Sequence, residues 1–173
     1  MRGDKGLKPL AEQVLVGEIV TQSKFAAIAA GRLAESSDPI EVWGAIQSIL
    51  VAAGNVSKIL WPVRGRYKER GKQLRGLIGV DDNNLLSDRS FRNHFEHYDE
   101  RVEEWFDGND SVAYSDSRID PMEGAPSSLS RLFHRSYNPV SQVLSLREES
   151  IDLSAVLAEL ATIREKCRYL ALQ

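Results

Sequence analysis

Hydrophobic side chains recur at helical spacing through the first third of the chain, and the stretch "SSDP" interrupts them once. This pattern predicts one helix over residues 10–35 and a second over about 39–60. Asp38 is a favoured N-cap residue and Pro39 suits the first helical position, so the second helix should begin there. Each helix has an apolar stripe that we expect to face the core. The stripe comprises Leu10, Val14, Gly17, Val20 or Thr21, Phe25, Ile28 and Leu33 on the first helix, and Ile40, Trp43, Ile46 or Gln47, Leu50, Ala53 and Leu60 on the second.

Proline and glycine divide the middle of the chain into two further helices. Trp61-Pro62 should end the second helix, because proline lacks a backbone donor and restricts the residue before it. A more polar helix is predicted over 63–78, closed by Gly79, and a fourth over 87–106. The expected inward residues are Tyr67, Leu74, Leu77 and Ile78 on the third helix, and Phe91, Phe95, Tyr98, Val102, Trp105 and Phe106 on the fourth.

The last third of the chain has a different texture. Residues 107–128 are rich in Gly, Ser, Asp and Pro, which is typical of a long surface loop. Residues 131–137 and 140–146 favour strands joined by a turn at Asn138-Pro139, and this predicts a small hairpin. A final helix should follow Asp152, its N-cap. Its expected inward residues are Leu153, Val156, Leu157, Leu160, Ile163 and Leu170.

These elements predict a mainly α fold, a bundle of about five helices with a small β-hairpin before the last helix, in one domain over residues 1–173. The composition agrees, with 42% hydrophobic and 27% charged residues, and a net charge of −3 provides no overall basic field. Cys167 is the single cysteine, which excludes an intrachain disulfide and favours a buried structural thiol. We expect no signal peptide and no membrane-spanning run, hence a cytoplasmic protein away from membranes.

Charge is nevertheless distributed unevenly along the chain. The stretch "RGRYKERGKQLR", residues 64–75, holds six Lys or Arg against one Glu. A basic run of this kind is most often a solvated face, but it is also compatible with an anionic partner. If that partner is RNA, the expected phosphate contacts are Arg64, Arg66, Lys68 and Lys72.

The polar face of the predicted helix over 87–106 carries a different chemistry. At about 100° per residue, Arg92, Asn93 and His97 avoid the centre of the aromatic arc, and Asn93 and His97 stand one turn apart. An imidazole exchanges a proton near neutral pH, while a guanidinium holds phosphate through paired hydrogen bonds. These residue types, facing one space, are suited to moving a proton while a phosphate is held.

The hexapeptide that contains them, "RNHFEH", resembles the arginine–polar–three residues–histidine motif of the HEPN family (higher eukaryotes and prokaryotes nucleotide-binding domains). The resemblance implies a helical bundle that cleaves RNA without a metal ion or cofactor, through attack of a ribose 2′-hydroxyl on the adjacent phosphate. It implies that His97 acts as acid or base, that Arg92 holds the phosphate and that Asn93 orients the histidine or a phosphate oxygen. Because the family's site usually forms between two facing helices, we expect a homodimer joined through the polar side of 88–104.

Three alternatives stay open. Arg89 and His94 repeat the same spacing, with serine instead of asparagine after the arginine. Many HEPN members lack nuclease activity, so the chain is alternatively a non-catalytic module that binds RNA, a nucleotide or another protein. A metal site is the third alternative, since His94, Glu96, His97 and Asp99 are crowded together, but no further His or Cys group supports it. An antitoxin partner and a toxin–antitoxin or defence role belong with the nuclease alternative.

Three basic residues on the predicted hairpin, Arg131, His134 and Arg135, admit two interpretations. They either add positive charge near the motif or solvate an edge strand. Solvation is the favoured interpretation, because charged residues commonly protect a strand edge from pairing with other chains.

Overall fold

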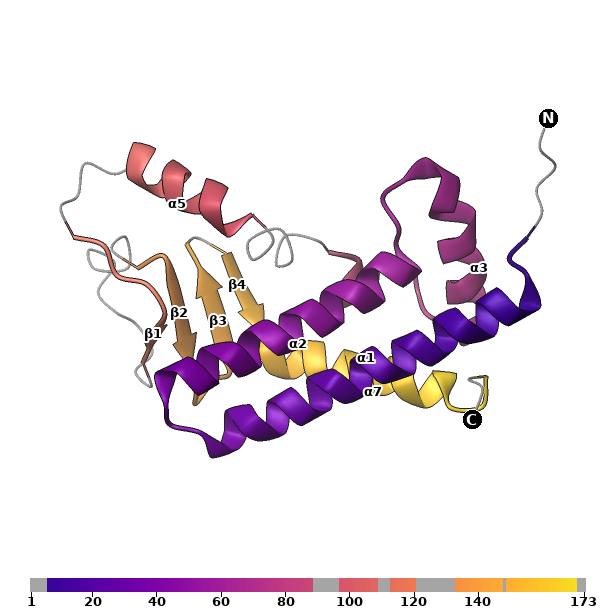
Figure 1. The fold of residues 1–173 in the computed structure, drawn as a ribbon, viewed down its shortest axis with the longest axis horizontal. Coiled ribbons are helices and arrows are strands. Elements are labelled where there is room, and N and C mark those ends of the chain that lie inside the picture. The colour runs from indigo at the N-terminus through magenta and orange to yellow at the C-terminus, as the bar shows by residue number, and fades with distance from the viewer. Residues whose placement is uncertain (1–5, 89–96, 109–112, 121–132, 148, 171–173) are drawn as a thin grey trace.

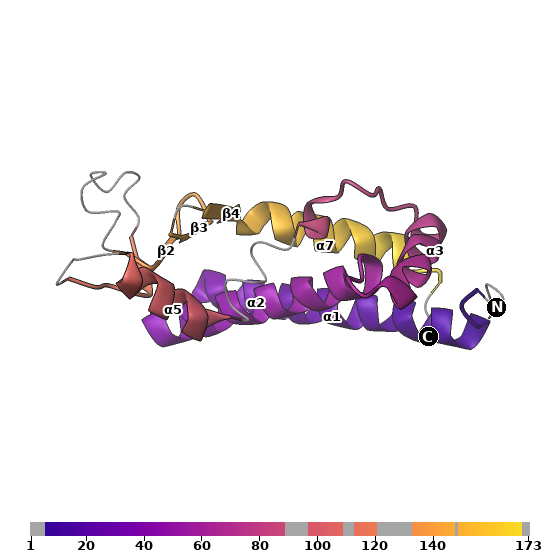
Figure 2. The ribbon, with the colours of Figure 1, turned by 90° about the horizontal axis from the view of Figure 1, so that it is seen from above.

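The computed structural model describes residues 6–88, 97–108, 113–120, 133–147 and 149–170. The fold has two layers: a long hairpin of two helices, and opposite it the last helix with a small sheet (Figure 1 and Figure 2). The predicted mainly α class, with a small sheet ahead of the last helix, is confirmed. The helical elements are α1 (Pro9–Glu35), α2 (Pro39–Leu60), η1 (Gly65–Tyr67), α3 (Lys68–Ile78), η2 (Leu85–Ser87), α5 (Tyr98–Asp107) and α7 (Leu153–Cys167), and the strands are β1 (Arg118–Ile119), β2 (Arg135–Asn138), β3 (Val143–Leu146) and β4 (Glu149–Asp152).

The start of α2 is set by the residues that predicted it. Oδ1 of Asp38 accepts hydrogen bonds from the backbone N–H groups of Ile40 (2.9 Å) and Glu41 (3.0 Å). These are donors that a helix N-terminus otherwise leaves unpaired, and Pro39 has no donor to lose. The hairpin of α1 and α2 then packs on α7 over a core that includes Ile19, Ile46, Ile49, Leu60, Leu160 and Ile163.

The inward face of α1 is not the one that its apolar stripe predicted. Leu10, Val14, Phe25 and Ile28 are each more than half exposed, so the prediction is wrong for them. The buried side of α1 carries mostly smaller residues, which allow α2 to pack closely along it. These residues are Val16, Ile19, Ser23, Ala26 and Ala29. On α2 the predicted stripe is correct except at Ile40, which is 82% exposed.

The predicted third helix begins later than expected. The 3-10 turn η1 comes first, because the chain bends by 79° between α2 and the segment 65–78. α3 then ends at Gly79, whose φ of +72° is the left-handed conformation that glycine adopts without strain. Leu74 and Ile78 face the core as predicted, whereas Leu77 is exposed.

A single helix over 87–106 was predicted, and this prediction is wrong. Asp88 has an extended backbone (φ −67°, ψ 135°), and His97 (φ −120°, ψ 42°) is the non-helical residue that precedes α5. α5 therefore begins only at Tyr98, and His97 is not part of it. The expected core residues Phe91 and Phe95 lie outside the described residues.

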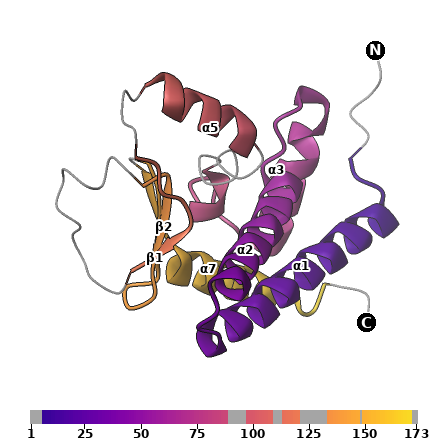
Figure 3. The same ribbon diagram turned by 60° about the vertical axis from the view of Figure 1, so that its left-hand side comes forward.

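α5 packs on an aromatic cluster instead. The indole of Trp105 is buried, and its ring meets the rings of Phe106 and Tyr114 edge-on, with centroids 4.8 Å apart in both pairs. Phe106 itself is more than half exposed, contrary to the prediction. Figure 3 shows α5 over the same end of the molecule as β1 and β2.

The predicted hairpin is present as β2 and β3, which pair antiparallel. The side chain of Asn138 accepts hydrogen bonds from the backbone N–H groups of Val140 (2.8 Å) and Ser141 (3.1 Å), and it closes the turn as expected. Both strands begin later than predicted. Two further strands complete a sheet of order β1-β2-β3-β4, with β1 parallel to β2 and inside the predicted loop. β1, with two residues, is too short for alternation to reveal it, and β4, which is exposed except at Ile151, has no alternating buried face.

α7 begins and packs as predicted. Oδ1 of Asp152 accepts a hydrogen bond from the backbone N–H of Ala155 (3.0 Å) and caps the helix. Cys167 is buried near its end, and burial raises the pKa of the thiol to about 11, so the thiol stays protonated near neutral pH. The residues that α7 buries in the core are Leu153, Val156, Leu160, Ile163 and Cys167.

α1 is long and apolar enough to cross a membrane by length and composition alone. The expectation of no membrane-spanning run stays a prediction, because length and composition alone do not place a helix in a membrane. Core helices of globular proteins meet the same criterion, and the buried side of α1 belongs to the main hydrophobic cluster with α2 and α7.

Candidate functional site

His97 stands at the start of α5 with its side chain half exposed. The exposed fraction is 50%, and Nδ1 lies 3.4 Å from Oε1 of Glu100, one turn along the helix. The backbone carbonyl of His97 accepts the first hydrogen bond of α5, from the N–H of Arg101 (3.1 Å). The other predicted catalytic residues lie outside the described residues, namely Arg92, Asn93 and the alternative pair Arg89 and His94.

The residue after His97 is anchored by its side chain. The hydroxyl of Tyr98 donates a hydrogen bond to Oδ2 of Asp116 (3.0 Å) and lies 3.4 Å from the hydroxyl of Tyr114. The Tyr98 ring stacks on the imidazole of His134, with centroids 5.6 Å apart and planes inclined by 15°. Because Tyr98 is held at both its hydroxyl and its ring, the backbone that carries His97 into α5 has a defined position.

An ion pair forms the centre of this network. Arg135 donates from Nε to Oδ1 of Asp116 (2.8 Å) and from Nη2 to Oδ2 (2.5 Å). Burial raises the pKa of Asp116, but the hydrogen bonds and charge of Arg135 outweigh it, and the pKa lies below its ordinary value. Burial likewise lowers the pKa of Arg135, while Asp116 raises it by more, so both groups are charged.

Aromatic rings enclose the Arg135 guanidinium and connect it to α2. The guanidinium carbon lies 4.3 Å from the ring centroid of Tyr98 and 5.4 Å from that of Trp43. The indole N–H of Trp43 in turn donates to the backbone carbonyl of Ser117 (2.7 Å). One cation therefore joins α2, α5 and β2, three elements far apart along the chain.

His134 is a core residue and does not solvate an edge. It is 4% exposed, and its Nδ1 lies 3.0 Å from the hydroxyl of Tyr114. Burial raises the pKa of Tyr114, and the neighbouring Tyr98 and Asp116 raise it further, so this phenol stays neutral. The favoured interpretation of His134 and Arg135 as solvating residues is thus wrong, and Arg131 lies outside the described residues.

Two arginines of the basic run have structural roles at the end of α2. Arg70 donates from Nη2 to the backbone carbonyl of Lys58 (3.1 Å), and Arg75 donates from Nη1 to that of Leu60. Arg75 also pairs through Nε with Asp82 (2.7 Å). The carbonyls at a helix C-terminus lack partners within the helix and carry partial negative charge, which these two cations complement.

The four predicted RNA contacts of the same run are exposed. Within the described part of the chain, Arg64, Arg66, Lys68 and Lys72 make no ion pair, and the guanidinium of Arg66 lies over the Tyr67 ring at 4.5 Å. Arg64 precedes η1, Arg66 lies in η1, and the two lysines lie in α3. α3 and α5 lie toward opposite ends of the molecule (Figure 1 and Figure 2). The basic residues and His97 are therefore not brought together in one compact site.

No group of three or more His, Cys, Asp or Glu side chains with the arrangement of a metal site occurs among the residues that the structure describes. Of the alternative metal site, His97 and Asp99 are described, whereas His94 and Glu96 lie outside. Comparisons with protein-family models, curated proteins and solved structures returned no match.

Three members of the network were missed by sequence reasoning. Tyr114 and Asp116 lie in the stretch assigned to a long loop, and Tyr98 was expected to be a core aromatic. Asp116 is 19 residues from Arg135 of β2, and Tyr114 is 20 residues from His134, which precedes that strand. Neither helical nor strand periodicity carries a signal over that interval.

Proposed function

We propose that this protein binds RNA and cleaves it without a metal ion, at a site built around His97. The observation that carries the proposal is the half-exposed imidazole of His97 at the start of α5. The residue that follows it, Tyr98, is anchored by the hydrogen bond from its hydroxyl to Asp116. An accessible imidazole on a fixed backbone suits a group that must meet a substrate proton in a repeatable geometry. Arg92 and Asn93, which precede it in "RNHFEH", supply the expected phosphate-binding and orienting groups.

The proposed reaction is a transfer within the RNA strand. A base removes the proton of a ribose 2′-hydroxyl, the 2′-oxygen bonds to the adjacent phosphorus, and the bond from phosphorus to the 5′-oxygen breaks. An acid gives the departing 5′-oxygen its proton, so the products are a 2′,3′-cyclic phosphate and a 5′-hydroxyl. His97 is the base or the acid, and Arg92 offsets the negative charge that grows on the phosphate oxygens.

Assembly and partners follow from the same proposal. A homodimer joined through the polar side of 88–104 would bring two copies of His97 to one composite site, so that one serves as base and the other as acid. The nuclease proposal also includes a cytoplasmic location, an antitoxin partner and a role in toxin–antitoxin or defence systems. The geometry of His97 does not bear on these three parts.

The second candidate function is a non-catalytic module that binds RNA, a nucleotide or another protein. The four exposed cations Arg64, Arg66, Lys68 and Lys72 favour it, because they offer phosphate contacts that need no catalytic group. The stacked Arg66 and Tyr67 add an aromatic face next to that charge, as single-stranded RNA sites commonly do.

The deciding experiment is incubation with mixed RNA in the presence of a chelator. We expect slow cleavage that His97→Ala and Arg92→Ala each lower by about a hundredfold or more, with 2′,3′-cyclic phosphate ends. His94→Ala is the matched control, because it removes a neighbouring imidazole of the same stretch. His97→Ala should fold as the wild type does, within about 0.5 kcal/mol, since the side chain is half exposed.

Equal cleavage by wild type and His97→Ala would place the activity elsewhere or in a contaminant. Loss in His94→Ala alone would assign the reaction to Arg89 and His94. Cleavage that stops only with chelator would favour a metal site, and RNA binding without any cleavage would leave the non-catalytic module.

A further inference from the structure

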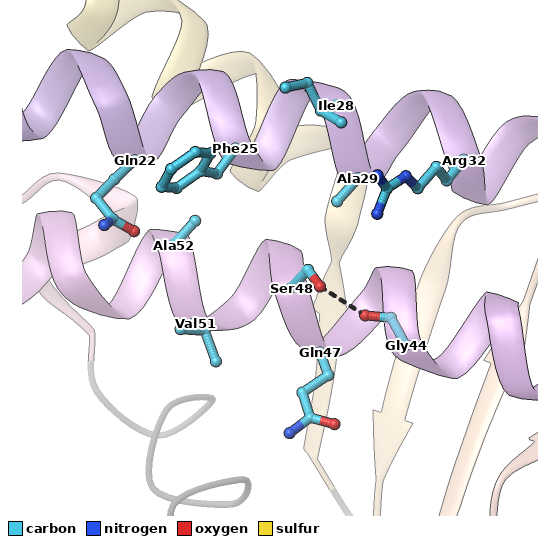
Figure 4. A pocket seen from close by; sticks show the side chains of 10 residues that line it. All are labelled: Gln22, Phe25, Ile28, Ala29, Arg32, Gly44, Gln47, Ser48, Val51 and Ala52. Atoms are coloured by element: carbon cyan, nitrogen blue, oxygen red, sulfur yellow. Dashed lines mark hydrogen bonds between the residues drawn. The ribbon is translucent and has the colours of Figure 1, made fainter.

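The outer face of the helical hairpin is apolar and has no covering element among the described residues. Leu10, Val14, Phe25 and Ile28 of α1 and Val51 of α2 are each more than half exposed. This face points away from α7 and the sheet, which lie behind the hairpin in the close view of Figure 4. A helix that is apolar on two sides is normally buried on two sides, and α1 buries one within this chain.

A groove runs between α1 and α2 on this face. It has two adjoining hollows of about 590 and 620 Å³, which share Ala29, Arg32, Gly44 and Ser48. Phe25 and Ile28 project from α1 along its edge, opposite Val51 of α2 (Figure 4). The groove is open at Gly44, where no heavy atom lies within 4 Å of the position that a Cβ would take.

Charges on α1 are arranged so that a second copy of the same helix would complement them. Glu18, Phe25 and Arg32 are spaced by seven residues each and so lie along one line of the helix. All three are exposed. A two-fold axis through Phe25 with the helices antiparallel would bring Arg32 opposite Glu18 of the partner subunit, and this would occur twice.

We propose that this face binds a second copy of the chain, with the two α1 helices antiparallel and crossing at Phe25. The area is sufficient. α1 has 27 residues, so it is about 40 Å long, and two neighbouring helices are about 20 Å wide. The face therefore offers about 800 Å², which is what each partner buries in a stable interface of standard size.

Polar groups on the face favour a protein over a lipid surface as its occupant. The groove is lined by Gln22, Gln47 and Ser48 as well as Arg32. Gln22 and Ser48 are already hydrogen-bonded within the chain, to Glu18 (2.6 Å) and to the carbonyl of Gly44 (2.8 Å). Hydrocarbon would instead strip water from the charge of Arg32 and the amide of Gln47, whereas a helical partner offers polar groups to both. The self-association is independent of the proposed nuclease, since it uses none of residues 88–104.

The test is a charge exchange followed by molar mass in solution, from light scattering over a concentration series. With α1 as the interface, wild type should be a dimer, and Glu18→Lys and Arg32→Glu should each raise the dimer dissociation constant by at least about tenfold. If residues 88–104 join two chains as well, wild type should be a tetramer and these two variants should fall back to a dimer. Mixing the two single variants should restore a dimer, because each of the two contacts then joins a cation of one chain to a carboxylate of the other. The double variant should also form dimers alone. Lys24→Glu, a charge reversal on the same helix away from this line, is the matched control and should stay dimeric.

A second pair of variants examines the apolar contact. Phe25→Ser should weaken the dimer. Tyr169→Ser should leave it intact, because Tyr169 is 86% exposed and follows α7, which packs on the side of the hairpin opposite this face (Figure 4). Circular dichroism should show unchanged helix content in all variants, since every substituted residue is exposed. The RNA assay on Phe25→Ser separates the two proposals, because this variant can lose the α1 interface while its cleavage is measured independently.

Several results would overturn the inference. These are a monomer at every concentration, a dimer indifferent to Phe25→Ser, and single variants that do not restore one another on mixing. Binding of wild type to vesicles of neutral and anionic phospholipid, lost in Phe25→Ser, would assign the face to a lipid surface instead.

Discussion

Arg135 and Asp116 meet through two parallel hydrogen bonds, of 2.8 Å from Nε and 2.5 Å from Nη2, with side chains only 18% and 16% exposed. Few charged side chains are this enclosed without a partner of opposite sign. The pair joins β2 to the segment between α5 and β1, and through Tyr98 it reaches the start of α5. The position of His97 is therefore tied to an ion pair that lies far from it along the chain.

Breaking that pair should destabilise the fold. We expect Asp116→Asn to lower the free energy of unfolding by about 2–3 kcal/mol, because it leaves the Arg135 charge enclosed and unpaired. Urea unfolding followed by circular dichroism measures the loss. Adding Arg135→Gln to Asp116→Asn should cost less than the two single changes together, since the unpaired charge is gone. Glu165→Gln, in the exposed pair with Arg168, is the control and should cause no measurable change.

The same carboxylate predicts a dependence of stability on acid. The pKa of Asp116 in the folded state lies below its ordinary value of 3.8. Its contribution is therefore complete above that value and is lost as the pH falls through the folded pKa. Urea midpoints measured between about pH 2 and pH 6 should fall on the acid side, and more steeply in the wild type than in Asp116→Asn. An equal slope in both proteins would mean that folding does not lower the pKa of Asp116. Asp152 and Glu104, whose pKa values are also lowered, should keep some of the slope in the variant.

Two glycines of α3 should respond in opposite ways to alanine. A Cβ at Gly71 would lie 2.5 Å from Cδ of Pro62 and 2.6 Å from the carbonyl oxygen of Leu60, so something must move. Gly71→Ala should therefore cost about 2 kcal/mol or more. A Cβ at Gly76 meets no heavy atom within 4 Å, and Gly76→Ala should stabilise by about 0.5–1 kcal/mol through helix propensity. Thermal unfolding of both variants measures the two effects. A Gly71→Ala protein as stable as the wild type would contradict this packing of α3 on α2.

The cap of α2 should be measurable by itself. Asp38→Ala removes the acceptor of two backbone donors and should lower the free energy of unfolding by about 1 kcal/mol. Asp38→Asn keeps a side-chain oxygen in the same place and should lose only a small part of that. Denaturant midpoints of the two variants are the comparison, and an equal loss in both would point to charge instead of hydrogen bonding as the stabilising factor.

RNA binding, if it occurs, should depend on the exposed part of the basic run. Changing Arg66, Lys68 and Lys72 to glutamine should reduce the slope of log affinity against log salt by about 2, at about 0.7 per lost single-stranded phosphate contact. The measurement is fluorescence anisotropy with labelled RNA over a salt series. Arg168→Gln, which removes an exposed cation just after the end of α7, serves as the control. An unchanged slope in the triple variant would assign the run to solvation.

Signals that act over one helical turn were sufficient for much of the fold. Asp38, Gly79 and Asp152 each mark a helix end through bonds or dihedral angles within a few residues, and the structure has them where the sequence predicts. The hairpin turn at Asn138 is local in the same sense. These local signals predicted the fold class, because they divide the chain into the helices and the hairpin of which the fold is built.

The remaining features were decided by contacts between distant segments. α1 is apolar on two sides, and only packing against α2 and α7 determines that Ile19 and Ala26 are buried while Phe25 is not. The anchoring of Tyr98 at the start of α5, and the burial of His134 and Arg135, involve Asp116 and Tyr114 from a stretch without periodicity. Periodicity shows that a face is apolar or polar, but which face finds a partner is fixed by the tertiary arrangement, because burial is a property of pairs of surfaces.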